Sequence, residues 1–146
     1  DWMGALVEIQ TESFAELLAG LPLFLSYAAT AAGLTLVYIV IYMWVTPHAE
    51  ITLIRQNNTA AAIAFAGSLL GFCLPLANVI AGSVSLVDCA LWGLIALIVQ
   101  IVIYFLARIP MPKISARIES GELAAGIWLG SASLAGGLLN AACMTY

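Results

Sequence analysis

Charged side chains are absent from four long stretches of the chain, which cover residues 17–49, 56–87, 89–107 and 123–146. Apolar residues dominate these stretches, and no strict alternation of polar and apolar positions indicates a β-strand. A helix that crosses about 30 Å of hydrocarbon at about 1.5 Å per residue needs roughly 20 residues. Each stretch is therefore long enough to cross a lipid bilayer.

The pattern predicts an all-α integral membrane protein with four transmembrane helices, at about Pro22–Val45, Thr59–Ser83, Cys89–Ala107 and Leu123–Met144. Helices are expected because lipid offers the backbone no other hydrogen-bond partner. Composition agrees, since 64% of the residues are hydrophobic, 8% are charged and the mean hydropathy is +1.09. These values exclude a soluble globular domain, and the four spans leave no room for a soluble catalytic domain.

The opening segment, residues 1–21, is predicted to be a short amphipathic helix that lies at the membrane interface. Ser13 and Glu16 have the spacing of a capping box. The acidic residues in this segment recur every four residues, which places them on one helical face: Glu8, Glu12 and Glu16. We expect Gly20 and Pro22 to end this helix. Near the far end of the first span, an aromatic belt at the headgroup level is expected from Tyr38, Tyr42 and Trp44.

The four basic residues predict the orientation. Arg55 lies in the link after the first span, and the link after the third span holds Arg108, Lys113 and Arg117. By the positive-inside rule, the links 46–58 and 108–122 face the cytoplasm and both termini face the periplasm.

A weak internal repeat appears when the chain is shifted by 64 residues. Ile54 then falls on Ile118, and the pair Ala60-Ala61 falls on Ala124-Ala125. Each half holds two spans, an even number, so the copies are expected to be parallel repeats, with the first over residues 22–83 and the second over 84–146.

Small residues form stripes on the second and fourth spans, including Gly67 and Gly71 on one and Gly126, Gly130 and Gly137 on the other. Small residues allow two helix backbones to approach closely in lipid. The stripes are predicted to be packing faces, either within the four-helix unit or between subunits.

Polar groups are few inside the spans. Pro75 interrupts the second span and predicts a kink. Asn78, Gln100 and Asn140 either line a polar pathway or bond across helices. The second interpretation is favoured because no span holds an internal Asp, Glu, Lys or Arg.

The link after the first span holds the single histidine, His48, close to Glu50. Thr46 fits an N-cap and Pro47 a first helical residue, which predicts a short interfacial helix through Arg55. His48 and Glu50 can also hold a metal or sense pH, but one histidine would need ligands from other subunits. The sequence shows no nucleophile triad, phosphate loop, dinucleotide motif or basic patch for nucleic acid, so neither a cofactor nor nucleic acid is expected. Cys73, Cys89 and Cys143 are expected to be buried thiols.

The sequence resembles the YjfL-like family of small bacterial inner-membrane proteins, a group of unknown function. The resemblance covers roughly residues 22–146. It rests on Thr46-Pro47-His48 with Glu50, Asn57 to Ala61, Gly67 through Leu76, Val84-Ser85, Trp92-Gly93, and the closing run from Asn140 to Tyr146. The resemblance implies a four-span plasma-membrane protein without catalytic residues. It also implies, by gene association, a peripheral partner similar to phage-shock protein A and a part in envelope stress or membrane maintenance.

Two hypotheses follow. The first is a non-enzymatic membrane protein that self-associates through its small-residue faces. It offers His48, Glu50, Arg55, Lys113 and Arg117 to lipid headgroups or a peripheral partner. The second is an oligomeric ion channel or small-solute transporter whose path is lined by Pro75, Asn78, Gln100 and Asn140.

Overall fold

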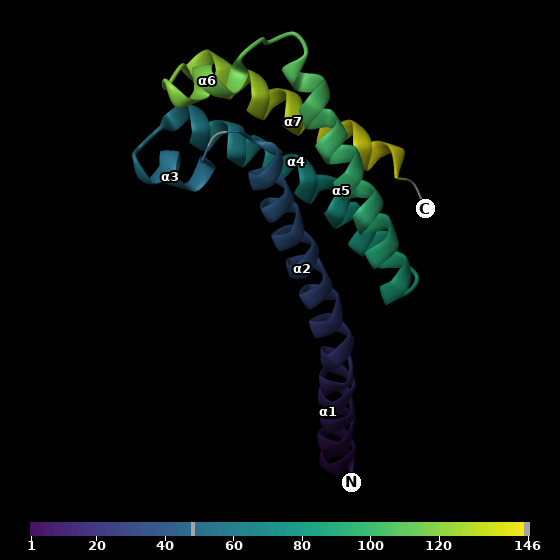
Figure 1. Cartoon of the computed structure of the whole chain (residues 1–146). Coiled ribbons are helices and arrows are strands. Elements are labelled where there is room, and N and C mark those ends of the chain that lie inside the picture. Colours follow the sequence, from purple (N-terminus) through teal and green to yellow (C-terminus); the bar gives the residue numbers. More distant parts are fainter. Residues whose placement is uncertain (48, 145–146) are drawn as a thin grey trace.

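The computed structural model describes residues 1–47 and 49–144. Over these residues the chain is entirely helical apart from its short connections (Figure 1). The helices are α1 (Trp2–Ala19), α2 (Leu21–Val45), α3 (Glu50–Arg55), α4 (Thr59–Gly82), α5 (Leu86–Arg108), α6 (Ile114–Glu119) and α7 (Leu123–Cys143). Four stretches are long and apolar enough to cross a membrane. The sequence-based prediction of an all-α protein with four such helices is therefore confirmed.

Local capping decides where these helices begin. Asn58 precedes α4, and its side chain accepts a hydrogen bond from the Ala61 amide at 3.0 Å. Before α5, the Ser85 hydroxyl accepts from the Asp88 amide at 3.1 Å, and the Asp88 carboxylate accepts from the Val84 amide at 3.2 Å. This reciprocal cap starts α5 at Leu86 instead of the expected Cys89.

Thr46 has a different role from the predicted one. It is the C-cap of α2, and its hydroxyl donates to the Tyr42 carbonyl at 2.8 Å. The short helix α3 starts only at Glu50, with Ala49 as a cap that makes no side-chain hydrogen bond. The prediction that Thr46 is an N-cap was wrong. The helix of the first span continues up to Thr46, so its hydroxyl bonds back into the last turn of that helix.

The helices α1 and α2 form one nearly straight rod that projects away from the other helices (Figure 1). The boundary falls at Gly20, as expected, but Gly20 keeps right-handed helical torsions. Its amide donates to the Glu16 carbonyl at 3.2 Å, and its carbonyl accepts from the Phe24 amide at 3.1 Å. Pro22 sits in the first turn of α2, where no backbone donor is needed. Gly20 and Pro22 therefore do not turn the chain.

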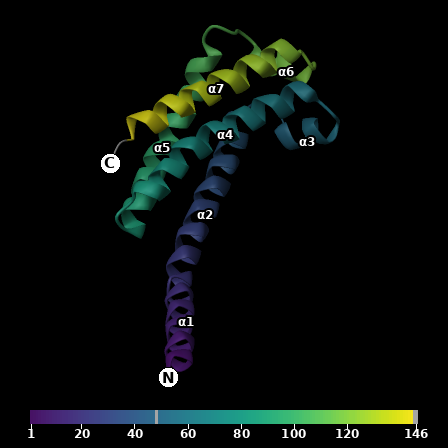
Figure 2. The same cartoon turned by 180° about the vertical axis from the view of Figure 1, so that it is seen from behind.

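The centre of the fold is the pair α4 and α7, which lie side by side (Figure 2). The two helices run in the same direction, and their stripes of small residues face each other. A Cβ added at Gly67 would strike the backbone of Gly130, and one added at Gly137 would strike that of Gly71. Near the start of both helices, a Cβ on Gly126 would lie 2.7 Å from the Cα of Ala60. The small-residue faces are thus packing faces within the chain, so self-association through them, as in the first hypothesis, has no free surface left.

The two halves of the chain carry equivalent elements 64 residues apart. This interval separates the first residues of α3 and α6 and those of α4 and α7. Both short helices end in the same motif, with Asn57 at φ 64° and Gly121 at φ 83°. In each, the amides of the left-handed residue and of the residue after it donate back into the short helix, as in a Schellman motif. A left-handed residue is required at this position, which glycine and asparagine tolerate best.

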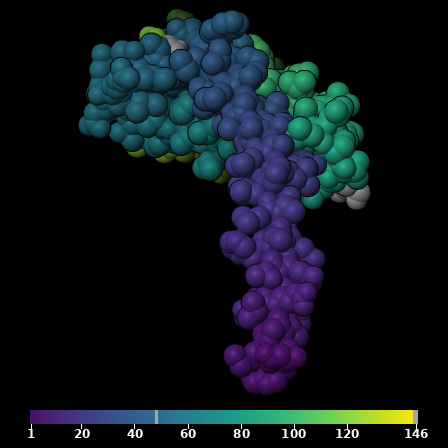
Figure 3. Space-filling model, turned by 90° about the horizontal axis from the view of Figure 1, so that it is seen from below, coloured from purple at the N-terminus to yellow at the C-terminus, as the bar shows by residue number. Residues whose placement is uncertain are grey.

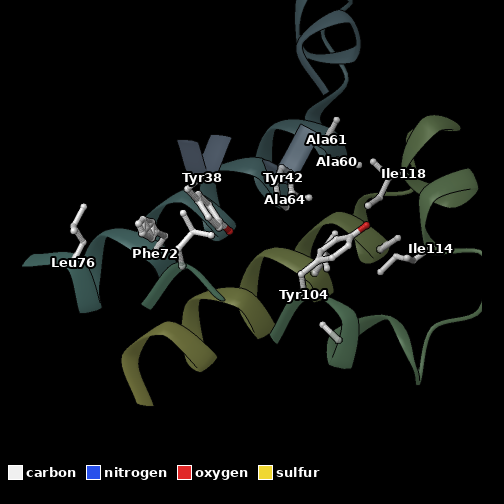
Figure 4. Close-up of a cluster of buried hydrophobic side chains, with 14 of the residues drawn as sticks. Tyr38, Tyr42, Ala60, Ala61, Ala64, Phe72, Leu76, Tyr104, Ile114 and Ile118 are labelled. Atoms are coloured by element: carbon white, nitrogen blue, oxygen red, sulfur yellow. The ribbon is translucent and has the colours of Figure 1, made fainter. Parts of the chain in front are cut away.

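Aromatic side chains fill the junction where α2 meets α4 and α5 (Figure 4). Tyr38 stacks on Phe72 with ring centroids 4.5 Å apart, and Tyr42 meets Tyr104 edge-on at 5.5 Å. Tyr38 and Tyr42 are 1% and 0% exposed, whereas Trp44 is 81% exposed. The prediction of an aromatic belt is therefore wrong for Tyr38 and Tyr42, which are core residues. Of the three aromatic residues, only Trp44 is exposed as a belt residue would be.

Candidate functional site

The two short helices α3 and α6 lie at the same end of the molecule, over the starts of α4 and α7 (Figures 1 and 2). Asn58 joins them. Its side-chain amide donates to the carbonyls of Ile118 at 2.9 Å and Glu119 at 3.3 Å, while its side-chain oxygen caps α4. The two links, distant in sequence, thereby form one surface, which we call the link end and define as residues 46–47, 49–58 and 108–122.

The basic side chains of the link end differ in their surroundings. Arg55 and Lys113 are exposed. Arg117 is half-buried, and its Nε donates to the Glu122 carboxylate at 2.7 Å. The Arg108 guanidinium lies over the Tyr104 ring, 5.7 Å from its centroid, a cation–π contact. Because Glu122 neutralises Arg117, Arg55 and Lys113 are the exposed side chains best placed to attract an anion.

A polar cluster lies beneath this surface, formed by one side chain from each of α2, α3, α5 and α6: Tyr42, Glu50, Tyr104 and Ser115. Glu50 is only 2% exposed, and it interacts electrostatically with the hydroxyl groups of Tyr42 and Tyr104. The hydroxyls of Tyr42, Tyr104 and Ser115 are buried and have no hydrogen-bond partner among the described residues. Four elements thus bring polar groups together in a region of low dielectric constant, where a buried hydroxyl without a partner is costly.

Glu50 therefore cannot meet a partner from solution directly, although it was predicted as an interaction residue. It does lie in the first turn of α3, as expected of an acid near a helix N-terminus. His48, predicted beside it, lies outside the described residues. Sequence reasoning missed Tyr104 and Ser115; the available signal was a polar-tipped aromatic one turn before Arg108, at the end of an otherwise apolar span.

The polar residues predicted inside the spans make contacts between helices. Asn78 donates to the carbonyls of Ala141 at 2.7 Å and Met144 at 3.0 Å, which ties α4 to the end of α7. Gln100 donates to the Ser133 carbonyl at 3.0 Å and ties α5 to α7. Asn140 is buried with its side-chain nitrogen unpaired among the described residues, and Pro75 is buried inside α4. Asn78 and Gln100 thus act as bonds between helices at separate places.

Two surface hollows border these elements. A groove of about 490 Å³ between the later halves of α4 and α7 is lined mostly by leucine and alanine, with Asn78. A polar hollow of about 360 Å³ lies at the link end between the turns that contain Asn57 and Gly121.

Within residues 1–47 and 49–144, no group of three or more metal-ligating side chains gathers. The thiols do not form a site: Cys89 is buried and Cys73 half-buried, but Cys143 is exposed, which corrects the expectation of three buried cysteines.

Comparisons with known proteins give a family match over most of the chain. A family described as a domain of unknown function, DUF350, matches residues 16–144. Two relatives, from Escherichia coli K12 and Escherichia coli O157:H7, are both named UPF0719 inner membrane protein YjfL. Each is 42% identical over 123 residues, which cover 84% of this chain and 93% of the relative. No solved structure matches.

Proposed function

The chain belongs to the DUF350 family, and from that premise we propose that it is a non-enzymatic, self-associating component of the bacterial inner membrane. Its link end receives anionic lipid headgroups or a peripheral partner on the cytoplasmic side. Membership confirms the resemblance read from the sequence motifs, and relatives named as inner-membrane proteins agree with the four apolar helices. The family name itself states no activity.

The observation that carries this proposal is the construction of the link end. Two short helices and the side chain of Asn58, which bonds from one link to the other, hold two distant links in one surface. On that surface Arg55 and Lys113 are exposed. A preformed surface loses little conformational entropy on binding, so a few charges there contribute more than the same charges on a loose loop.

We also propose that the chain arose from two parallel two-helix repeats, residues 22–83 and 84–146. The 64-residue interval between equivalent helices and the matching turns at Asn57 and Gly121 support this. A duplicated unit explains why α4 and α7 run in the same direction and why both links fall on one side of the membrane.

The proposed partner is a coiled-coil protein similar to phage-shock protein A, which connects the chain with envelope stress or membrane maintenance. The chemistry required of it is an acidic segment that reaches Arg55 and Lys113. The alternative of an ion channel or small-solute transporter has less support, because Asn78 and Gln100 are engaged in bonds between helices.

Loss of the two exposed basic residues should weaken recruitment. In the double variant Arg55→Ala/Lys113→Ala, we expect up to a roughly 25-fold loss of partner binding at low salt, because each exposed ion pair with an acidic segment contributes up to about 1 kcal/mol, or about fivefold. Flotation of a purified phage-shock-protein-A-like protein with zwitterionic proteoliposomes measures this, because the vesicles themselves then carry no net charge. Glu8→Ala/Glu12→Ala is the matched control at the other end of the chain. Binding that is equal in all three proteins would refute the proposed surface.

The proposed orientation places both termini in the periplasm and residues 46–58 and 108–122 in the cytoplasm, because all four basic residues lie in the links. A reporter enzyme that is active only in the periplasm should be active when fused after Tyr146. The same reporter inserted after Ser120 should be inactive. The reverse pattern would overturn the orientation without affecting the fold.

A further inference from the structure

The rod formed by α1 and α2 exposes a seam of large apolar side chains that no other part of residues 1–47 and 49–144 covers. Every residue of α1 is exposed. Large apolar residues recur at alternating intervals of four and three positions, and the exposure ranges from 46% at Leu21 to 76% at Leu17. We call these residues the rod seam: Met3, Val7, Phe14, Leu17, Leu21 and Phe24, with Gln10 at the one polar position. The spacing continues through Gly20 because the backbone stays helical there.

Length places part of the seam beyond the hydrocarbon core of the membrane. The rod spans 44 residues, Trp2–Val45. At about 1.5 Å per residue it is about 66 Å long, and even a tilt of about 40° leaves roughly 50 Å along the membrane normal. The hydrocarbon core is about 30 Å thick, and α2 alone is long enough to cross it. Figure 3 shows the N-terminal part of this rod standing clear of the other helices, so α1 extends past the lipid tails.

Charge argues against the lipid surface as the cover for α1. Helices that lie on membranes combine an apolar face with a Lys- and Arg-rich polar face. Here the polar face holds Glu8, Glu12 and Glu16, and residues 1–54 contain no Lys or Arg. At about 100° per residue, these glutamates point away from the rod seam, on the opposite side of the helix. Anionic headgroups would repel the face that holds the glutamates. A protein partner bound to the rod seam would instead leave the glutamates in water.

We infer that the rod seam of one copy packs against the rod seam of a second copy, side by side and in the same direction. Copies of one membrane protein insert with the same orientation, so identical seams lie at the same height. Spacing of three and four residues is that of helices crossing at about 20°, with side chains interlocked. Two seams in contact keep all six glutamates on the outside, and the two Gln10 side chains meet, which fixes the register. The inference rests on the proposed self-association and names its surface.

Cysteine cross-linking in intact membranes tests the seam. The full chain is used with Cys73, Cys89 and Cys143 replaced by alanine. Phe14→Cys and Leu17→Cys place a thiol on the seam, and Glu12→Cys and Glu16→Cys place one on the opposite face of the same turns. Because a disulfide needs Cα atoms about 4.4–6.8 Å apart, mild oxidation should give at least about tenfold more disulfide-linked dimer from the seam positions.

The outcomes separate this inference from the proposed function. Equal cross-linking on both faces would overturn the seam, because it indicates random collision. Absence of cross-linking would overturn it in favour of α1 lying in the membrane interface if brominated lipids quench the wild-type tryptophan fluorescence more than that of a Trp2→Phe variant. If light scattering of the purified protein still shows an oligomer, the seam is wrong and self-association stands; if it shows a monomer, both are wrong.

Discussion

A Gly137→Ala variant is expected to lose more than about 3 kcal/mol of stability, above the usual cost of overpacking, and to separate α4 from α7. The new methyl group would fall on the carbonyl oxygen, carbonyl carbon and Cα of Gly71. These are backbone atoms of a helix, so no side-chain rotation relieves the collision. The helices must move apart, which also weakens the close approaches of Gly67 to Gly130 and of Gly126 to Ala60.

Close approach matters more here than in a water-soluble bundle. In lipid the hydrophobic effect does not drive two apolar helices together, because the lipid tails are equally apolar. Dispersion contacts and short polar contacts supply the association instead, and both weaken steeply with distance. The hydrogen bond between the hydroxyls of Ser68 and Ser133, 3.2 Å long, lies in the same interface and would be lost with it.

The variants are heated in detergent, and thermal unfolding is monitored as the fraction of protein that stays monodisperse in size-exclusion chromatography. Gly33→Ala and Gly4→Ala are matched controls, because an added Cβ at either position meets no atom within 4 Å. Both should retain wild-type stability or gain a little, since alanine favours the helix over glycine by up to about 1 kcal/mol. Equal stability of Gly137→Ala and Gly33→Ala would contradict the structure of the α4–α7 interface.

A Tyr42→Ala variant is expected to lose about 3 kcal/mol, the lower end of the range for deleting a buried aromatic ring. Tyr42 is 0% exposed and contacts the rings of Tyr38, Phe65 and Tyr104, with centroids 6.1, 5.8 and 5.5 Å away. Its loss leaves a cavity where α2 joins α4 and α5. The lower end of the range applies because a ring in a membrane protein is not transferred from water. The stability loss then comes only from the cavity that the missing ring leaves.

Tyr42→Phe separates the ring from the hydroxyl group. The hydroxyl is buried and has no hydrogen-bond partner among the described residues, so its removal should change stability by less than about 1 kcal/mol. Trp44→Ala, two residues away and 81% exposed, is the control for loss of an aromatic ring outside the core. Unfolding in the same detergent compares the three variants. A loss in Tyr42→Phe as large as that in Tyr42→Ala would show that the hydroxyl, and not the packing of the ring, holds the cluster.

The predictions from sequence were accurate where one residue or one short segment decides the outcome. The spans begin and end within a few residues of their expected positions, and Asn58 and Ser85 explain the starts of α4 and α5. The small-residue stripes of α4 and α7 lie against each other in the structure. The predictions failed at Thr46, Tyr38 and Tyr42, because the role of each depends on which helix continues or arrives beside it.

The candidate site shows the same division. The exposed charges Arg55 and Lys113 were found from the sequence, since isolated charges between apolar spans stand out. Tyr104 and Ser115 were missed, because nothing near them in the sequence indicates that four separate elements bring their hydroxyls beside Glu50. Glu50 was expected at a surface, and only the tertiary structure, in which α3 packs against α4, makes it a buried residue.

The sequence by itself determined that this chain has four membrane-spanning helices with its basic residues on two links. The physical reason is that insertion of a segment into the membrane depends on the length, apolarity and flanking charge of that segment, which are local properties of the sequence. The tertiary structure alone decided that the glycine faces meet within one chain, that Glu50 and two tyrosines are buried, and that α1 continues α2 as a straight rod. These features depend on contacts between residues far apart in the sequence, and a local pattern does not specify such contacts.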